Sequence, residues 1–410
     1  MEVVIVFAVI LLLVGVKIVY EAINEKKRLL YKLRSEYGKV PNKEYTSEKF
    51  EGLRYYYDTI KDENLDVDNI TWNDIDMDEI YMLMNNTSCS IGEEYLYAKL
   101  RKLQYDNSKL DSFDTLVDYF STHDKEREEL QFLLLQMGIT NKISIFEYIN
   151  RLKQVKEENI AIHVFQAVGF LSSILFILVN PMIGGTLTVG FLAWNITTYY
   201  KAKAKFDKYL AVVKYISSML KQAKKISQLD NEAIRPIVDV MKQESKSLAS
   251  FNAGMSAICE STGSMLDMLF DYIRILFHLD IIVFYRALDL FVRNESSLIK
   301  LFECYGELDS AIAVASFREM LPYYAKPCFS SNKKDIKISN LYHPLISDPV
   351  VNSIEENQSV LITGSNASGK STFIKTVAIN AILAQTIYTA LCDEYEASYF
   401  IVISSMALRD

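Results

Sequence analysis

Long apolar stretches dominate the pattern of hydrophobic and polar positions along the chain. Near the N-terminus every residue from Val3 to Val16 is apolar or Gly, and the stretch extends through Tyr20. Its length of about 18 residues suffices for a helix to cross a bilayer if Lys17 reaches the interface. Basic residues follow at 26–28, which favours an uncleaved membrane anchor over a cleaved signal peptide.

A second apolar stretch lies in the middle of the chain, where no Asp, Glu, Lys or Arg occurs between Glu158 and Lys201. Asn-Pro and Gly-Gly pairs divide it into two parts of about 18 to 20 residues, each long enough to span a bilayer. The pattern predicts a transmembrane hairpin with helices over 160–179 and 182–199, and a buried core hairpin is the alternative. His163 is either an interfacial side chain or a proton-active site.

Basic residues flank all three expected spans on the same side. They follow the first span, precede the second and follow the third. The positive-inside rule then places the N-terminus outside and both 21–159 and 200–410 in the cytoplasm. The pattern therefore predicts a multi-pass protein of the cell membrane, in contact with membrane lipid.

The remaining sequence is mainly helical in pattern. Ser90 to Glu94 is typical of a helix start, and Leu266 to Val292 predicts an apolar, core-facing helix. The polar, Tyr-rich residues 40–75 predict an irregular segment. From Lys201 to Lys225 eight lysines occur with one acid. The lysines of such a helix have three alternative roles: they form a solvated surface, they contact anionic lipid headgroups, or they contact nucleic-acid phosphates.

Charge and cysteine usage narrow the class of protein. The formal net charge of −8 argues against a chain that acts as a whole as a basic nucleic-acid binder. The five cysteines include no CxxC pair, and the four histidines show no ligand spacing. These features predict unpaired thiols in a reducing compartment.

The most specific chemical signal is a glycine-rich octet that matches G-x-x-x-x-G-K-[ST] in full. It consists of Gly364, Ser365, Asn366, Ala367, Ser368, Gly369, Lys370 and Ser371, with Thr372 directly after it. Residues 359–363 predict a short buried strand before the octet, and the apolar sequence from Lys370 onward predicts a helix. Strand, turn and helix in this order aim backbone N–H groups at phosphate.

The residue types of this loop suit ATP and Mg²⁺. Gly364 and Gly369 permit a close approach that a side chain would block. Lys370 is expected to bridge the β- and γ-phosphates, and the hydroxyl of Ser371 is expected to bind Mg²⁺. The sequence therefore predicts a nucleotide-binding site over residues 364–372.

The loop and several other segments resemble the MutS family. Residues 362–373 resemble the family's P-loop, in which Asn stands two positions after the first Gly. Residues 341–345, with His343-Pro344, resemble the His-Pro motif at the start of the ATPase domain. Residues 307–313 are similar to the segment that joins the lever helices to that domain, and residues 87–96 to the start of the core domain. The likeness covers roughly 70–155 and 201–410.

The resemblance implies an ATPase that forms a homodimer through this domain, with each site completed by the partner subunit. ATP would be coupled to movement of the lever helices. Asn366 would contact phosphate, and Val350 and Val351 would lie near adenine, where the family often has an aromatic residue. The resemblance also implies binding of mismatched DNA, which the net charge does not support.

The chain departs from the family pattern in three respects. It shows no mismatch-reading domain with its Phe-x-Glu wedge, and an apolar hairpin interrupts its helical region. An acidic pair for Mg²⁺ and general-base chemistry is expected beyond Asp410, together with the signature loop. The catalytic residues are therefore unknown, and hydrolysis by this chain stays open.

The expected fold is mainly α with a C-terminal α/β P-loop NTPase half-domain and three transmembrane helices. The expected domains are a transmembrane anchor (1–20), a cytoplasmic segment (21–75), a helical core-like domain (76–159), the transmembrane hairpin (160–200), a lever-like helical region (201–310) and the first part of a truncated ATPase domain (311–410).

The leading functional hypothesis is a MutS-like ATPase of the mismatch-repair type, tethered to the membrane. The alternative is a membrane-bound scaffold that uses nucleotide binding as a switch, without DNA repair. A transporter-type ATPase is disfavoured because three spans scarcely form a pathway.

Overall fold

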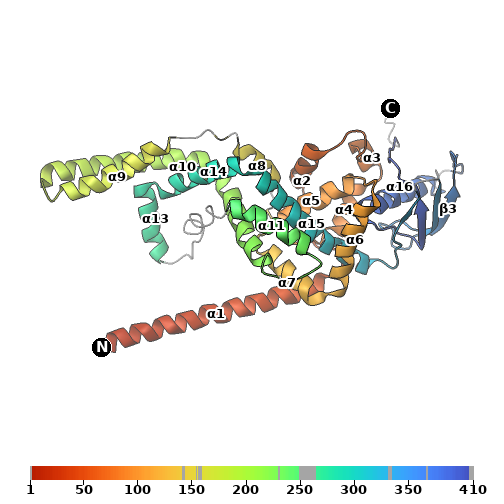
Figure 1. Ribbon diagram of the computed structural model, residues 1–410, viewed down its shortest axis with the longest axis horizontal. Coiled ribbons are helices and arrows are strands. Elements are labelled where there is room, and N and C mark those ends of the chain that lie inside the picture. Colours follow the sequence, from red (N-terminus) through yellow and green to blue (C-terminus); the bar gives the residue numbers. More distant parts are fainter. Residues whose placement is uncertain are drawn as a thin grey trace. The chain divides into compact units, whose positions relative to one another are not determined.

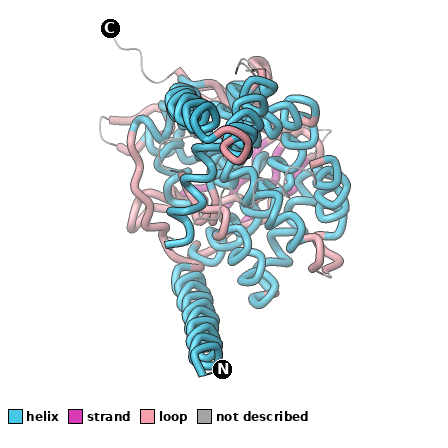
Figure 2. The backbone as a smooth tube through the Cα atoms, turned by 90° about the vertical axis from the view of Figure 1, so that its left-hand side faces the viewer, coloured by secondary structure: helices cyan, strands magenta, loops and turns pink. Residues whose placement is uncertain are grey.

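The computed structural model describes residues 2–140, 144–153, 155, 159–229, 231–248, 265–330, 335–365 and 368–405. Helices make up most of this part of the chain, and its strands belong to one sheet (Figure 2). Two compact units divide the chain: Met1–Lys142 together with Tyr305–Asp410, and Ile143–Cys304. The first unit therefore joins sequences from both ends of the chain and contains the glycine-rich loop.

The first unit opens with a series of helices (Figure 1). They are α1 (Glu2–Glu36), α2 (Ser47–Ile60), α3 (Asn69–Asp74), α4 (Met77–Met84), α5 (Ser90–Arg101), α6 (Asn107–Thr122) and α7 (Asp124–Leu135). The helix start predicted at Ser90 is confirmed as the first residue of α5.

The expectation of an irregular segment over 40–75 is wrong, because α2 and α3 form within it. Their N-caps are Thr46 and Asp68, whose side chains accept hydrogen bonds from backbone N–H groups of the first turn. Capping of this kind stabilises a helix start by about 1 kcal/mol. Three aromatic residues of the segment, Tyr56, Tyr57 and Trp72, are buried in the core. Polar capping residues alternate here with core aromatics, which conceals the helical pattern.

A small mixed sheet and one helix complete the first unit. The strands are β1 (Cys328–Phe329), β2 (Ile336–Leu341), β3 (Asn352–Glu356) and β4 (Glu394–Ala397), in the order β1-β4-β2-β3. The β1–β4 pair is parallel, while β2 pairs antiparallel with both β3 and β4. Helix α16 (Lys370–Ile387) packs on this sheet through Ala384, beside Ile338 and Tyr395. The predicted helix after the loop is thereby confirmed.

The buried strand expected over residues 359–363 is not formed, and residues 398–405 likewise lie outside every strand. The side chains of Val360 and Leu361 are 50% and 87% exposed. A strand requires a neighbour whose backbone groups complete its hydrogen bonds. Within the described residues the sheet ends at β3, and no further strand is present to pair with these segments.

Arg318, which is buried on α15 (Glu295–Met320), fixes the C-terminal end of α16. Its guanidinium donates hydrogen bonds to the carbonyls of Ile387 (3.3 Å) and Tyr388 (2.9 Å) and to the Thr389 hydroxyl (2.9 Å). An ion pair with Asp114 (2.7 Å) compensates its charge. A cation at this end is favourable because helix carbonyls concentrate negative partial charge there. The helix that begins at the glycine-rich loop is thus held firmly at its far end.

The second unit consists of helices. They are α8 (Ile145–Leu152), α9 (Ile160–Phe176), α10 (Pro181–Ile226), α11 (Arg235–Ser247), α13 (Met265–Phe277), α14 (Leu279–Arg293) and the beginning of α15 (Glu295–Met320). The single helix expected over 266–292 is two helices. His278 separates them because its φ of 53° lies in the left-handed region, which a continuous right-handed helix cannot contain.

The prediction of three transmembrane helices is wrong, and with it the multi-pass membrane location. No helix among the described residues combines the length and apolar character needed to cross a bilayer. Helix α9 ends after 17 residues, and α10 continues as one helix from Pro181 through the lysine-rich sequence to Ile226. The expected second half of the hairpin also carries Gly, Thr and Asn residues that reduce its apolar character. The first expected span falls largely on residues whose side chains lie outside the described set.

The seam between α9 and α10 contains buried polar side chains beside aromatic contacts such as Phe165–Phe191. Gln166 and Asn195 are fully buried there, and the amide of Gln166 donates to the hydroxyl of Thr198 (2.9 Å). By contrast, Leu178 and Met182 at the turn are each 85% exposed. The continuous apolar sequence that predicted membrane spans thus includes many side chains outside the core. His163 lies in the seam, with its Nδ1 2.9 Å from Nδ1 of His278.

Candidate functional site

The glycine-rich loop leads directly into the first turn of α16. Gly369 is the N-cap residue, with φ at 84°, a conformation that other residues adopt only with strain. A side chain on Gly364 would place its Cβ 2.9 Å from the Ser368 hydroxyl. The two glycines therefore allow the backbone to curl tightly before the helix starts. The first turn of α16 contains no acidic side chain, so its N–H groups face no negative charge of their own helix.

The side chain of Lys370 folds back over this loop. Its ammonium donates hydrogen bonds to the carbonyl oxygens of Gly364 (2.7 Å) and Ser365 (2.6 Å) and lies 3.4 Å from the Ser368 hydroxyl. Backbone carbonyls are neutral acceptors, and phosphate oxygens form stronger, charge-assisted hydrogen bonds with an ammonium. The arrangement therefore suits exchange of the loop carbonyls for phosphate.

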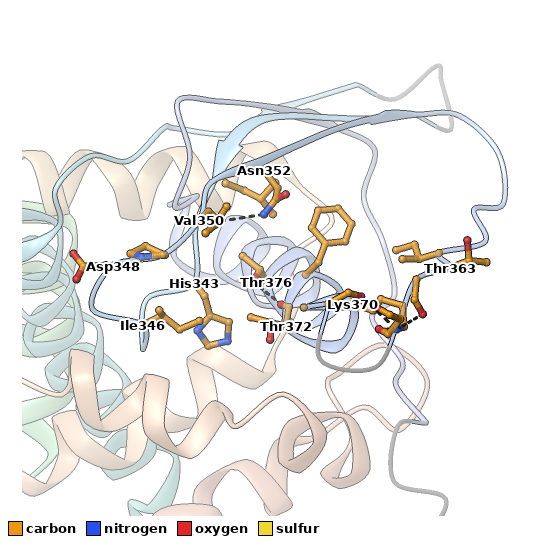
Figure 3. A pocket seen from close by; sticks show the side chains of 17 residues that line it. His343, Ile346, Asp348, Val350, Asn352, Thr363, Lys370, Thr372 and Thr376 are labelled. Carbon is orange, nitrogen blue, oxygen red and sulfur yellow. Dashed lines mark hydrogen bonds between the residues drawn. The ribbon is translucent and has the colours of Figure 1, made fainter.

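A cavity of about 760 Å³ adjoins the loop, a volume in the range typical of small-molecule sites. Figure 3 shows Lys370 and Thr363 at one end, with His343, Ile346 and Val350 at the other. The lining also includes Leu341, Asp348, Pro349, Asn352, Ile362, Gly364, Ser365, Ser368, Gly369, Thr372, Phe373 and Thr376. One end of the cavity is thus polar and cationic, while the other combines apolar walls with a few polar groups.

The structure brings most of the predicted site residues to this cavity. Five of the loop residues line it, namely Gly364, Ser365, Ser368, Gly369 and Lys370, together with Thr372. Val350 also lines it, whereas Val351, predicted beside it, is not a lining residue and is 44% exposed. Ser371 is exposed on the first turn of α16 without lining the cavity. Asn366 and Ala367 lie outside the described residues.

His343 is a lining residue to which the sequence pattern assigned no site role. Its pKa is lowered mainly by burial and further by the nearby ammonium of Lys375, while Asp76 opposes the shift. Lys375 and Asp76 form an ion pair at 2.6 Å. The imidazole is therefore neutral at neutral pH. The His-Pro pair marked the position, but only the folded chain shows that the ring faces the same cavity as Lys370.

The chain is similar to known proteins over part of its length. The DNA mismatch repair protein MutS of Thermotoga sp. (strain RQ2) is 33% identical over 100 residues, or 23% of this chain and 12% of that protein. The DNA mismatch repair protein MSH3 of Debaryomyces hansenii is 30% identical over 138 residues, 31% of this chain and 12% of that protein. Endonuclease MutS2 of Streptococcus suis is 36% identical over 67 residues, 16% of this chain and 9% of that protein.

No protein-family model matches the chain. The partial similarities support a MutS-like relation, which confirms in coarse form the resemblance seen in the sequence. The chain matches only about an eighth of the length of these MutS and MSH3 relatives. The relation therefore concerns a portion of each protein.

Proposed function

We propose that this chain is a MutS-like, mismatch-repair-related protein that binds ATP with Mg²⁺ at residues 364–372. One observation carries the proposal. The ammonium of Lys370, held 2.7 and 2.6 Å from two loop carbonyls, lies between the N-terminus of an 18-residue helix and a cavity of about 760 Å³. A positive helix end, a mobile cation donor and adjoining space for a nucleoside are the features that triphosphate binding requires.

The roles of the residues follow from this arrangement. Phosphate oxygens would replace the carbonyls of Gly364 and Ser365 as acceptors for Lys370. The Ser371 hydroxyl would supply a ligand to Mg²⁺. In the described part of the chain no three His, Cys, Asp or Glu side chains gather to hold a metal ion. Mg²⁺ would therefore depend on the hydroxyl, the phosphates and water, as is common for this ion. Val350 would lie beside the base.

Replacing Lys370 with Ala tests the binding site. Loss of charge-assisted hydrogen bonds to two phosphates, at about 1.5 to 3 kcal/mol each, should weaken ATP binding by at least roughly 100-fold. Isothermal titration calorimetry with Mg-ATP measures this. Lys337→Ala is the matched control because Lys337 is exposed on β2 and is not a cavity-lining residue. Equal affinity of the Lys370→Ala and wild-type proteins would refute the site.

The partners follow from the MutS-like relation as further proposals. We propose a homodimer through residues 311–410, the first part of a MutS-type ATPase domain, with 76–159 as the core-like domain and 201–310 as the lever-like region. DNA is the proposed macromolecular ligand. A nucleotide-dependent switch without DNA repair is the second candidate, and the net charge of −8 favours it.

A DNA-binding measurement over a salt series separates these two candidates. Contacts with phosphates release counterions, so affinity should fall steeply as salt rises, and a mismatched duplex should bind more tightly than a matched one. Weak binding with a flat salt response would favour the switch.

A further inference from the structure

His343 holds an unusual position in the candidate nucleotide site. It is the second residue after β2, and it is 8% exposed while lining the same cavity as Lys370. The neighbouring Tyr342 anchors the segment through two hydrogen bonds. Its backbone N–H donates to the backbone carbonyl of Leu391 (3.0 Å), and its hydroxyl donates to the backbone carbonyl of Tyr323 (2.8 Å). The backbone that carries the ring is therefore anchored just after the end of β2.

One hydrogen bond fixes the tautomer of the His343 ring. The backbone N–H of Leu345 donates to Nδ1 at 3.3 Å, so Nδ1 carries a lone pair. A neutral imidazole with an acceptor at Nδ1 must carry its proton on Nε2. The lowered pKa, caused by burial and by Lys375, keeps the ring neutral. His343 is thus a fixed, uncharged donor through Nε2–H.

The Nε2–H donor has no protein acceptor among the residues that the structure describes. Nε2 is not one of the fully buried atoms that lack a partner, so water in the cavity can accept its hydrogen bond. The lining at this end of the cavity includes the apolar side chains of Leu341, Ile346 and Val350 and the carboxylate of Asp348, which forms no hydrogen bond with His343. A ligand acceptor that enters the cavity can therefore replace the water at this donor.

The position of His343 indicates which part of a nucleotide supplies that acceptor. In Figure 3 His343 and Ile346 lie on one side of the first turns of α16, while Lys370 and Thr363 lie on the other. The phosphates belong at the cationic end, beside Lys370. A neutral donor beside apolar side chains and the carboxylate of Asp348 suits a neutral acceptor rather than a phosphate, such as a ring nitrogen of the base or a ribose oxygen.

We propose that His343 is a specificity-determining residue whose Nε2–H donates a hydrogen bond to the nucleoside half of the bound nucleotide. This assignment rests on the proposed function of the loop, because it takes the phosphates to bind at Lys370. The apolar wall formed by Val350 and Ile346 would contact the base, and His343 would supply the directional contact that an apolar wall lacks.

Two amide substitutions test the assignment. The side-chain nitrogen of Gln reaches the place of Nε2, whereas that of Asn reaches only the place of Nδ1. His343→Asn should weaken Mg-ATP binding roughly five- to tenfold, the effect of one lost hydrogen bond of about 1 kcal/mol or slightly more. His343→Gln should restore most of that affinity. Inorganic tripolyphosphate, which has no nucleoside, should bind wild type and both variants equally.

Calorimetric titrations of the whole chain with Mg-ATP, Mg-2′-deoxy-ATP and Mg-tripolyphosphate provide these values. A loss that also appears with tripolyphosphate, or an Asn variant that binds ATP like wild type, would overturn the assignment. A loss of discrimination against 2′-deoxy-ATP assigns the contact to the ribose 2′-hydroxyl, and unchanged discrimination assigns it to the base or to another ribose oxygen. If wild type binds neither ATP nor tripolyphosphate, the proposed loop function fails instead.

Wild-type protein offers an independent measurement if a variant does not fold. In protein labelled with ¹⁵N at its four histidines, the Nε2 resonance of His343 should shift when ATP binds and stay in place when tripolyphosphate binds. Binding of ATP without any shift of this resonance would refute the contact while leaving the loop function intact.

Discussion

Helices α5 and α16 of the first unit differ at their N-terminal ends. The backbone N–H groups at the start of α5 have an anionic partner within the protein, whereas those at the start of α16 have none among the described residues. At the start of α5 the carboxylate of Asp309 accepts hydrogen bonds from the backbone N–H groups of Ser88 (2.9 Å) and Cys89 (3.0 Å). At the start of α16 no acidic side chain is present in the first turn, and Lys370 contacts its own loop. The backbone N–H groups thus hold a buried carboxylate at the start of α5, whereas those at the start of α16 remain available to a ligand.

Burial explains the difference between these helix ends. Asp309 is fully buried, and burial raises the pKa of its carboxyl to about 6 in spite of the donors from Ser88 and Cys89. An internal anion therefore pays a permanent desolvation penalty. The loop before α16 is largely exposed, and its anion would arrive with a ligand. We call the start of α5, where Asp309 accepts hydrogen bonds, the closed end, and the loop before α16 the open end. The closed end contributes to the stability of the fold, and the open end contributes to ligand binding.

The largest effect is expected from removing the internal anion. Asp309→Ala leaves the N–H groups of Ser88 and Cys89 without their acceptor, at about 1 to 3 kcal/mol each, for a total near 4 kcal/mol. Urea unfolding followed by the fluorescence of buried Trp72, in a Trp194→Phe background, measures the loss. Ser368→Ala in the open loop should change the free energy of unfolding by less than about 0.5 kcal/mol. Equal losses for the two variants would contradict the distinction between the ends.

The second-largest effect is expected from the titration of Asp309, which should make the free energy of unfolding depend on pH. Its folded pKa of about 6 lies above the ordinary value of 3.8, so the folded chain holds this proton more tightly. The resulting stabilisation, up to about 3 kcal/mol, is fully present below about pH 4 and is lost as pH rises through 6. The difference in unfolding free energy between wild type and Asp309→Asn, measured from pH 4 to 7, should show this slope.

Asp348→Asn is the control for that titration, because Asp348 is exposed at the open cavity. It should leave the slope between pH 4 and 7 unchanged. A slope that persists in Asp309→Asn would assign the pH dependence to other groups.

The sequence predicted the first residue of both helices, Lys370 of α16 and Ser90 of α5, but not the carboxylate that meets the start of α5. Residues 364–371 match a contiguous motif, and the helix from Lys370 follows from its apolar pattern, so local information sufficed. Asp309 and Ser88 are 221 residues apart, and nothing near either residue specifies the other. The carboxylate at the start of α5 therefore emerged only from the fold, as did the direction of the His343 ring.

The errors of sequence interpretation have a related cause. A continuous apolar stretch predicted membrane helices, yet the seam of α9 and α10 buries the polar Gln166 and Asn195. Hydropathy averages over a window and does not record which side each residue faces. Likewise, residues 359–363 have a strand-like composition, but pairing depends on a neighbouring strand that the local sequence does not contain.

Adding a methyl group at Gly92 should produce the next largest effect. A Cβ there would lie 2.0 Å from Oδ2 of Asp309, whose carboxylate is fully buried. Such overpacking costs about 2 kcal/mol. Gly190→Ala on α10 is the control, because no atom lies within 4 Å of its added Cβ. That change should stabilise by about 0.5 to 1 kcal/mol through helix propensity. If Gly92→Ala leaves the free energy of unfolding unchanged, the closed end is not tightly packed.

The smallest effect is expected at the open end. Gly369 has a φ of 84°, but a Cβ added there would meet no atom within 4 Å. Only backbone strain opposes Gly369→Ala, so the free energy of unfolding should fall by about 1 kcal/mol, less than for Gly92→Ala. Because the loop would lose its preferred curl, affinity for Mg-ATP should fall more than stability does. A calorimetric titration beside urea unfolding compares the two losses. A stability loss matching that of Gly92→Ala, with ATP affinity unchanged, would show that the start of α16 is a packed structural joint like the start of α5.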